Sequence, residues 1–435
     1  MSSIIKVNTV QDANGNNIIN ESGNTVTIGK SGDTVNVVGT LQNNGAASLG
    51  TLTSLTVNGN VSVDGGTIKL DGSYPTGTDN TALGDTALDS VEAGGASNTA
   101  IGHNAGTSIT TGDGNTAIGD LALDANTTSH DNVAVGRCAL TTNITGANNV
   151  GVGSYALRDS IGSDNVAVGA GSALKTTGGC NVSIGSNSLK CNVGGANNTA
   201  VGFESLRANT TADNNTAMGF QALLDNSTGT VNTAMGRQSL QNNTTGSGNT
   251  AYGHNTLNTV TTNGCNTAVG GSALFNNTAA NNTALGHSAL VANTTGDQNV
   301  AVGVSALACN TEGLENTAVG RFALCANATG DNNTAVGKAA LQKSTTDNNT
   351  AVGMETLACT TSGFGTAVGY RAMKANTTSS GGTAMGYQAL CSNTTGGDNT
   401  AFGLETLSKN TTGTNNTAVG RDALELNTTA SGNTA

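Results

Sequence analysis

A five-residue pattern of Asn, Thr or Val, Ala, an apolar residue and Gly recurs along most of the chain at intervals of 16 or 17 residues. Segment 331–359 contains it twice, as NTAVG at 333–337 and again at 349–353. There are 21 copies between Gly84 and Gly420, and the last residues, NTA, begin another. This restatement of small and apolar positions is typical of a repeat protein, in which each unit stacks on its neighbours.

The hydrophobic and polar positions within one repeat predict two short strands. Thr199, Ala200 and Val201 form the first, and their alternation puts the first and third side chains on one face, which we expect to point inward. Leu206, four residues past Gly202, marks the second strand. The glycine permits a sharp bend, and the Asn-, Thr- and Gly-rich remainder is turn chemistry. Each repeat therefore reads as strand, bend, strand and polar loop.

A single coil of this kind cannot be stable alone. Ordering each residue costs roughly 1 to 2 kcal/mol, whereas burying an aliphatic side chain returns only about 1.5 to 3 kcal/mol. We therefore expect the coils to stack about 4.8 Å apart, with Asn333 over Asn349 and Val336 over Val352 as ladder rungs. The predicted fold class is all-β, a parallel β-solenoid of about 21 coils with 16–17-residue repeats. At that spacing the rod would be roughly 100 Å long.

Composition supports this class and excludes others. The chain of 435 residues has no Trp, one Pro, 62 Gly and 3% aromatic residues, too few large side chains for an ordinary globular core. Charged residues make up only 10%, unlike a disordered chain. The formal net charge of −12, without any cluster of Lys and Arg, argues against nucleic acid and anionic membranes as partners. We also expect no membrane span and no secretion signal peptide.

Residues 1–76 lack the repeat and are predicted to form a small β-rich attachment or cap region, followed by a solenoid shaft over 77–435 that ends within a repeat. The boundary is expected around Pro75. Alternating segments separated by Gly or Asn-Gly turns predict four N-terminal strands, at Thr25–Gly29, Thr34–Gly39, Ser54–Val63 and Thr67–Leu70.

The repeated pattern, followed by x-x-Ala-Leu, resembles the repeat of trimeric autotransporter adhesin heads over roughly Asp79 to Ala435. That resemblance implies a left-handed β-roll made by three chains, with two inward aliphatic positions per strand and one sheet facing the trimer axis. The repeat here is longer than in that family. Neither the family's secretion signal nor its membrane anchor is found in the sequence.

The opening residues, MSSIIKVNTVQDANGNNIIN, are similar to the N-termini of tail-fibre-like structural proteins of marine tailed phages. This resemblance implies an attachment segment ahead of the repeats. It also implies assembly in the cytoplasm and release by lysis, so that no signal peptide is needed. The implied location is a virion or an extracellular fibre.

Several motifs that suggest chemistry have a simpler interpretation. The Gly-x-Gly segments at 151–153 and 169–171 do not open a helix, so repeat bends explain them better than a phosphate loop. His103 and the other histidines that follow a bend glycine occupy a position that tolerates many residues. No zinc spacing is present. We therefore expect no cofactor, no metal and no catalytic residue.

Three further features leave alternatives open. Cys309 and Cys325 fall on neighbouring coils, where reduced packing residues are favoured over a disulfide. Asp331 and Asp347 could form a stacked Ca²⁺ site, but solvated loop acids are the favoured interpretation. An outward Thr column could bind ice. Its replacement by Val in several copies, including Val166, favours an inward position instead.

The candidate binding surface is formed by the two variable positions after each bend glycine. We expect Phe203 to stack near Phe220 and Tyr370 near Tyr387, with Phe322 on the same surface. Aromatic side chains beside polar groups suit sugar rings. The alternative is that these positions are loosely constrained because they face solvent, or that they contact another chain.

The sequence therefore predicts a structural and adhesive fibre protein, a trimeric tail-fibre shaft that contributes to host-surface attachment, and not an enzyme. The alternative is a self-assembling extracellular filament whose solenoids join end to end through exposed strand edges. An ice- or Ca²⁺-binding solenoid is a minor alternative. The expected partners are further copies of the chain and a cell-surface glycan.

Overall fold

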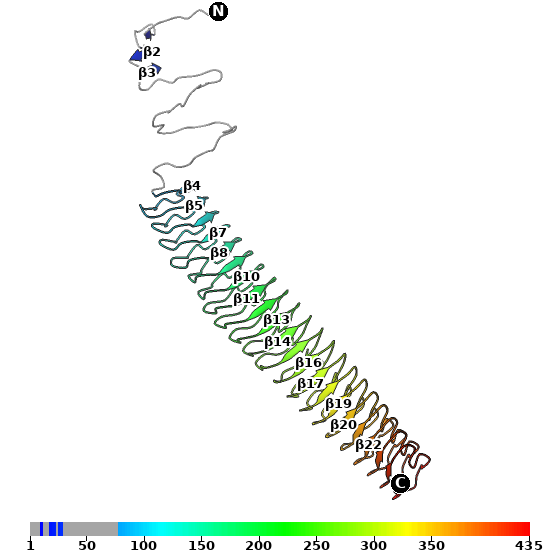
Figure 1. Ribbon diagram of the computed structural model, residues 1–435. Helices are drawn as coiled ribbons and strands as arrows, with labels where there is room; N and C mark the ends of the chain where they lie inside the picture. The colour runs from blue at the N-terminus through cyan, green and yellow to red at the C-terminus, as the bar shows by residue number, and fades with distance from the viewer. Residues whose placement is uncertain (1–8, 12–16, 23–24, 29–76) are drawn as a thin grey trace, which may run out of the picture. The chain divides into compact units, whose positions relative to one another are not determined.

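The computed structural model describes residues 9–11, 17–22, 25–28 and 77–435 (Figure 1). The chain divides into two units, residues 1–68 and 69–435. In the first, β1 (Thr9–Gln11), β2 (Asn17–Ser22) and β3 (Thr25–Ile28) form an antiparallel sheet in that order. β3 coincides with the first predicted N-terminal strand. The predicted strands at 34–39, 54–63 and 67–70 lie outside the described residues.

The second unit is a parallel β-solenoid with one three-residue strand in each coil. Consecutive strands pair in register, Thr beside Thr and Ala beside Ala, and β4 and β24 lie at opposite ends of an open ladder (Figure 1). No described residue is helical, so none of them forms a membrane-spanning helix. The predicted parallel solenoid is confirmed. The strands are β4 Thr81–Leu83, β5 Thr99–Ile101, β6 Thr116–Ile118, β7 Val133–Val135, β8 Val150–Val152, β9 Val166–Val168, β10 Val182–Ile184, β11 Thr199–Val201, β12 Thr216–Met218, β13 Thr233–Met235, β14 Thr250–Tyr252, β15 Thr267–Val269, β16 Thr283–Leu285, β17 Val300–Val302, β18 Thr317–Val319, β19 Thr334–Val336, β20 Thr350–Val352, β21 Thr366–Val368, β22 Thr383–Met385, β23 Thr400–Phe402 and β24 Thr417–Val419.

The faces of the strand are the reverse of the prediction. The central Ala is buried, as at Ala200, whereas the residues on either side of it point outward and are only half-buried. The reason is visible at β8, where Gly replaces the Ala. A Cβ on Gly151 would lie 3.3 Å from the Ala156 carbonyl oxygen and 3.4 Å from the Leu140 side chain. The leucine column and the turn backbone therefore limit this position to small residues from inside the coil.

The predicted second strand is absent from the described coils. The segment around each buried leucine is a turn with left-handed residues, such as Glu204 (φ 54°) and Leu206 (φ 49°). It is closed by a hydrogen bond from the Ser205 N–H to the Gly202 carbonyl. Left-handed backbone at a non-glycine residue costs on the order of 1 to 3 kcal/mol. Contacts between coils must offset this cost, and the Leu206 N–H donates to the Ala222 carbonyl of the next coil at 2.9 Å.

Two columns of buried asparagines connect the coils, and the first confirms the predicted rung of Asn349 on Asn333. The Asn349 backbone N–H and Nδ2 donate to Asn333 Oδ1 at 3.0 and 3.1 Å. In the second column, Asn209 Nδ2 donates to Asn192 Oδ1 at 2.7 Å and to the Ala212 carbonyl at 3.0 Å. Because buried amides need partners, each coil depends on the next to satisfy its polar interior.

The bend requires glycine for two separate reasons. Gly337 has φ +135°, a conformation that residues with a side chain rarely adopt. A Cβ there would also lie 2.4 Å from the Gly353 carbonyl oxygen of the next coil. The glycine column thus allows the coils to approach closely enough for the strand ladder to form.

The assignment of faces predicts a ranking of substitutions within one coil. Ala335→Asp and Leu341→Asp each bury a charge without a partner, so each should destabilise its part of the rod by about 3 to 5 kcal/mol. Val336→Asp, on the outer face, should cost less, and the exposed Lys338→Asp should be nearly silent. Thermal unfolding followed by circular dichroism measures the order. A larger loss of thermal stability for Val336→Asp than for Ala335→Asp would show that Val336, and not Ala335, points into the coil.

Candidate functional site

The variable face consists of the two residues that follow each bend glycine. The bend directs the first of them outward, and the coil spacing brings equivalent side chains of neighbouring coils together. The second residue has a left-handed backbone, as at Gln221 (φ 54°), and hydrogen-bonds to the preceding coil. Its backbone is therefore fixed while its side chain is free to differ between coils.

Four of the five predicted aromatic residues form two stacked pairs. The ring centroids of Phe203 and Phe220 are 5.6 Å apart with an interplanar angle of 12°, and those of Tyr370 and Tyr387 are 5.2 Å apart at 20°. The predicted stacking is confirmed. Phe203, Phe220 and Tyr387 remain exposed, so the pairs present apolar rings at the surface.

Phe322 does not join either pair. It occupies the second variable position, and the Arg321 guanidinium lies 4.5 Å from its ring centroid. Arg371 lies over Tyr370 at 4.9 Å, and Arg237 over Phe220 at 5.9 Å. The five predicted residues thus form three separate aromatic clusters along the solenoid, two stacked pairs and one single ring, each beside an arginine.

Tyr155 is a further aromatic residue of the variable face that was not predicted from the sequence. Arg137 and Arg158 approach its ring centroid to 4.6 and 5.6 Å, from the preceding coil and from the same coil. Arg158 is held by Asp159 through hydrogen bonds of 2.9 and 2.6 Å. The sequence signal for Tyr155 was an aromatic residue at the second variable position with an arginine, Arg137, one coil earlier. Phe322 is also an aromatic residue at the second variable position, but its arginine, Arg321, is in the same coil.

Charged side chains on and beside the variable face form local networks. Glu355 accepts hydrogen bonds from Lys374 at 2.7 Å and Arg371 at 2.8 Å, and these hold the pKa of Glu355 below its ordinary value. The pKa of Glu204 is lowered in the same way, first by Gln221 and then by Arg207. These hydrogen bonds hold the long side chains of the two networks against the surface of the solenoid.

The loop aspartates bind backbone groups. Asp347 Oδ1 accepts from the Asp331 N–H at 2.9 Å, and Asp331 Oδ1 accepts from the Leu314 N–H at 2.7 Å. His103 Nδ1 lies 2.9 Å from Asp120 Oδ1. Within residues 77–435 and the short described N-terminal strands, no three His, Cys, Asp or Glu side chains gather as metal ligands.

The cysteines of the described region are free thiols. Cys309 and Cys325 lie side by side, with the Cys309 N–H donating to the Cys325 carbonyl at 3.0 Å. Burial, together with the neighbouring Cys309 thiol, raises the pKa of Cys325. A raised pKa disfavours the reactive thiolate at this pair.

Comparison of the chain with protein-family models, curated proteins and solved structures finds no match. The repeat geometry and the variable face are therefore the basis for a functional assignment.

The Glu355 network predicts a pH-dependent contribution to stability. Its folded pKa is lowered, so the contribution is present above the unfolded pKa, about 4.3, and is lost as the pH falls through the folded value. The Tm difference between the native protein and Glu355→Gln should therefore shrink between pH 7 and pH 3. Glu312→Gln, on an exposed turn, is the control. A Tm difference that is the same at every pH would contradict this role.

Proposed function

We propose that the chain is the shaft of a homotrimeric fibre, a tail-fibre-like structural protein whose three solenoids pack through their strand faces and whose variable faces contact a host surface. The observation that carries this proposal is the outward strand face, which bears an uninterrupted row of apolar side chains along the solenoid.

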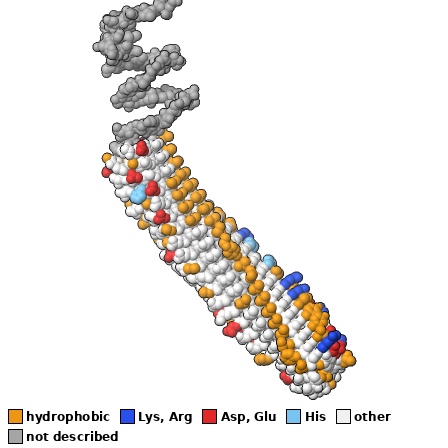
Figure 2. Space-filling model, viewed as in Figure 1, with side chains coloured by type: hydrophobic (Ala, Val, Ile, Leu, Met, Phe, Trp, Pro, Cys, Tyr) orange, Lys and Arg blue, Asp and Glu red, His pale blue; other side chains and the backbone are white. Residues whose placement is uncertain are grey.

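The row is formed by the residue before each bend glycine. Figure 2 shows a ridge of apolar side chains along the side of the rod that carries the strands in Figure 1. Tyr252 is 44% exposed and Phe402 38%. The stripe continues over 21 strands, and long contiguous apolar surfaces on soluble proteins mark interaction sites. The other exposed members of the stripe are Leu83, Ile101, Val168, Ile184, Met218, Leu285, Met385 and Val419.

A second copy of the chain is the partner that fits this stripe. Its side chains recur at the strand spacing of about 4.8 Å, and another copy offers the same repeat over the same length. None of the 21 strands contains a charged residue, so two strand faces can meet despite the net charge of −12. The Ala column cannot make this contact, because it is buried within its own coil. The resemblance to autotransporter heads favours three copies.

The attachment role rests on the variable face, which follows the bend glycine in each coil and which this proposal requires to stay accessible when the strand faces pack. Its stacked aromatic pairs and neighbouring arginines suit polar ring compounds such as glycans. Residues 1–76, which resemble phage attachment segments, would join the shaft to a larger assembly in a virion or an extracellular fibre.

Ice binding is a second candidate because the structure removes the argument against it. The Thr column points outward, and four successive strands, β18 to β21, present identical Thr-Ala-Val rungs. The column was expected to face inward because Val replaces Thr in some copies. If the strand face is free in solution, a regular hydroxyl array would be available to ordered water.

The shaft proposal predicts that the protein has about three times the 42.6 kDa mass of one chain in multi-angle light scattering. The triple variant Val319→Lys, Val336→Lys, Val352→Lys puts like charges on adjoining strand faces and should reduce that mass to one chain with its β-type circular dichroism retained. The matched control places three lysines on exposed turns, at Thr295, Thr329 and Thr345, and should stay trimeric.

A native protein that is monomeric at micromolar concentration would contradict the trimer. Inhibition of ice growth by that monomer would support the second candidate, and indefinite filaments in negative-stain micrographs would support end-to-end assembly instead.

A further inference from the structure

We propose that a groove across three successive coils, between Tyr155 and Lys190, binds a carboxylate-bearing sugar unit of an anionic polysaccharide. The inference deepens the proposed attachment role and rests on it for its biological setting, but the binding itself can be measured on the soluble protein.

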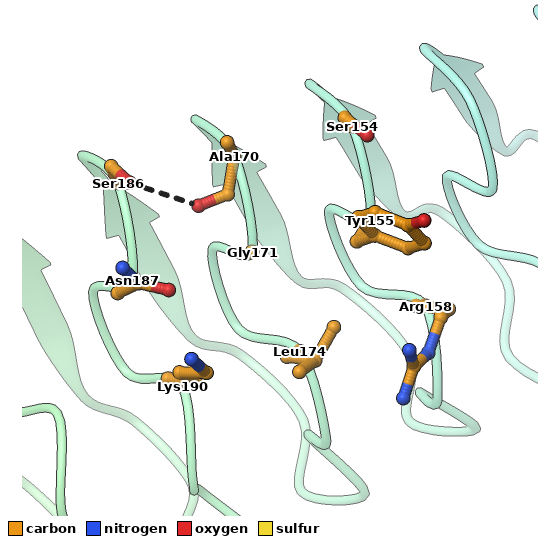
Figure 3. Close-up of a pocket in the computed structure, with 9 residues that line it drawn as sticks. All are labelled: Ser154, Tyr155, Arg158, Ala170, Gly171, Leu174, Ser186, Asn187 and Lys190. Carbon is orange, nitrogen blue, oxygen red and sulfur yellow. Dashed lines mark hydrogen bonds between the residues drawn. The ribbon is translucent and has the colours of Figure 1, made fainter.

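The groove has a volume of about 380 Å³ and is lined by a regular grid of side chains from three coils (Figure 3). Its floor is the middle coil, which contributes Ala170, Gly171 and Leu174. Ala170 and Gly171 occupy the two variable positions, and few coils have such small residues at both. The groove therefore exists because the middle coil has no long side chain at either variable position. Its volume lies within the usual range for small-molecule sites.

The two flanking coils form the walls. One wall carries Tyr155 and Arg158, and the other carries Asn187 and Lys190 (Figure 3). Because the walls are two coil spacings apart, roughly 9 to 10 Å, a single flat ring can lie on the apolar floor with its edges toward polar groups. Ser186 is already oriented at the rim, where its hydroxyl donates to the Ala170 carbonyl at 3.3 Å (Figure 3).

The charge around the groove favours an acid over a neutral sugar. Residues 137–190 contain four basic residues, Arg137, Arg158, Lys175 and Lys190, and two acids, Asp159 and Asp164, for a net charge of +2 in a chain of −12. Asp164 lies on the loop before the strand, where it accepts a hydrogen bond from Asn148. Asp159 is engaged by Arg158.

The roles of the cations follow from their partners. Asp159 holds the Arg158 guanidinium in place against the wall, so that its remaining N–H groups have a defined direction. Lys190 lies at the other wall. Glu204 of the next coil lies close enough to interact with its charge, but Glu204 also binds Arg207 and Gln221, and the residues that line the groove include no acid. A sugar whose carboxylate lies at Lys190 and whose ring lies against Tyr155 and the apolar floor would contact both the charged and the apolar parts of the groove.

The test uses the full-length protein and two forms of one probe, tetragalacturonic acid and its uncharged methyl ester, in isothermal titration calorimetry. We expect the acid to bind at least about tenfold more tightly than the ester, and the difference to fall with added salt. Lys190→Gln should weaken binding of the acid about tenfold, and Lys190→Arg should restore most of it.

Ala170→Phe fills the groove and should abolish binding. The same position is Phe203 and Phe220 in other coils, so the fold accepts this side chain. Val304→Phe, at the equivalent exposed position of a distant coil, is the matched control and should bind as the native protein does.

Equal affinity for acid and ester, or unchanged binding by Ala170→Phe, would overturn the proposal. A duplex oligonucleotide that binds as tightly as the uronate would also overturn it, because the region would then be a general anion surface. Light scattering on the same samples keeps the two proposals apart. A trimer that does not bind overturns the groove alone, and a monomer that binds overturns the trimer alone.

Discussion

Hydrogen bonding between successive coils is the constraint on which the rest of this structure depends. A coil encloses too few side chains for an ordinary hydrophobic core, and it contains several left-handed residues that are unfavourable in isolation. In most coils the two columns of buried asparagines offset this cost, because the amides pair with those of a neighbouring coil. The columns have gaps: glycine occupies the first column at Gly365 and Gly382, and Asn126 bonds within its own coil. Asn333 both donates to Asn316 and accepts from Asn349. Register between coils is thereby fixed by polar groups and not by apolar packing alone.

This constraint separates the residues that cannot change from those that can. Most inward positions hold Asn, Leu or a small residue such as Ala or Ser, because the interior is narrow, and the bend is held to Gly by the carbonyl of the next coil. Outward positions experience neither limit. The chain can therefore place an apolar stripe on the strand face and a changing set of aromatic, basic and small residues on the variable face. Both functional proposals use surfaces that the stacking leaves free.

The repeat length, the parallel solenoid, the Asn333 to Asn349 rung and the two aromatic stacks could be predicted from the sequence because each follows from placing like residues above one another. The direction of the strand faces could not be predicted by alternation alone, since a period of two is equally consistent with either phase. The range of side-chain sizes at each strand position did indicate which side chains point outward. A position that accepts Val201, Tyr252 and Phe402 is unlike a narrow interior, whereas Ala200 and its equivalents are nearly constant. The second strand was predicted from the position of Leu206 alone, whereas the positive φ of this residue places it in a turn. The groove at Ala170 was missed because it consists of missing side chains.

Two adjacent asparagines provide the most direct test of the claim that buried amide columns hold the coils together. Asn332 is exposed with φ 57°, and other coils have glycine at this position, whereas Asn333 is fully buried in the column. The measurement is the thermal unfolding of Asn333→Gly and Asn332→Gly. We expect Asn333→Gly to lose about 1 to 3 kcal/mol, because the buried Asn349 N–H loses its acceptor, and Asn332→Gly to remain close to the native protein. Equal stability of the two variants would contradict the account.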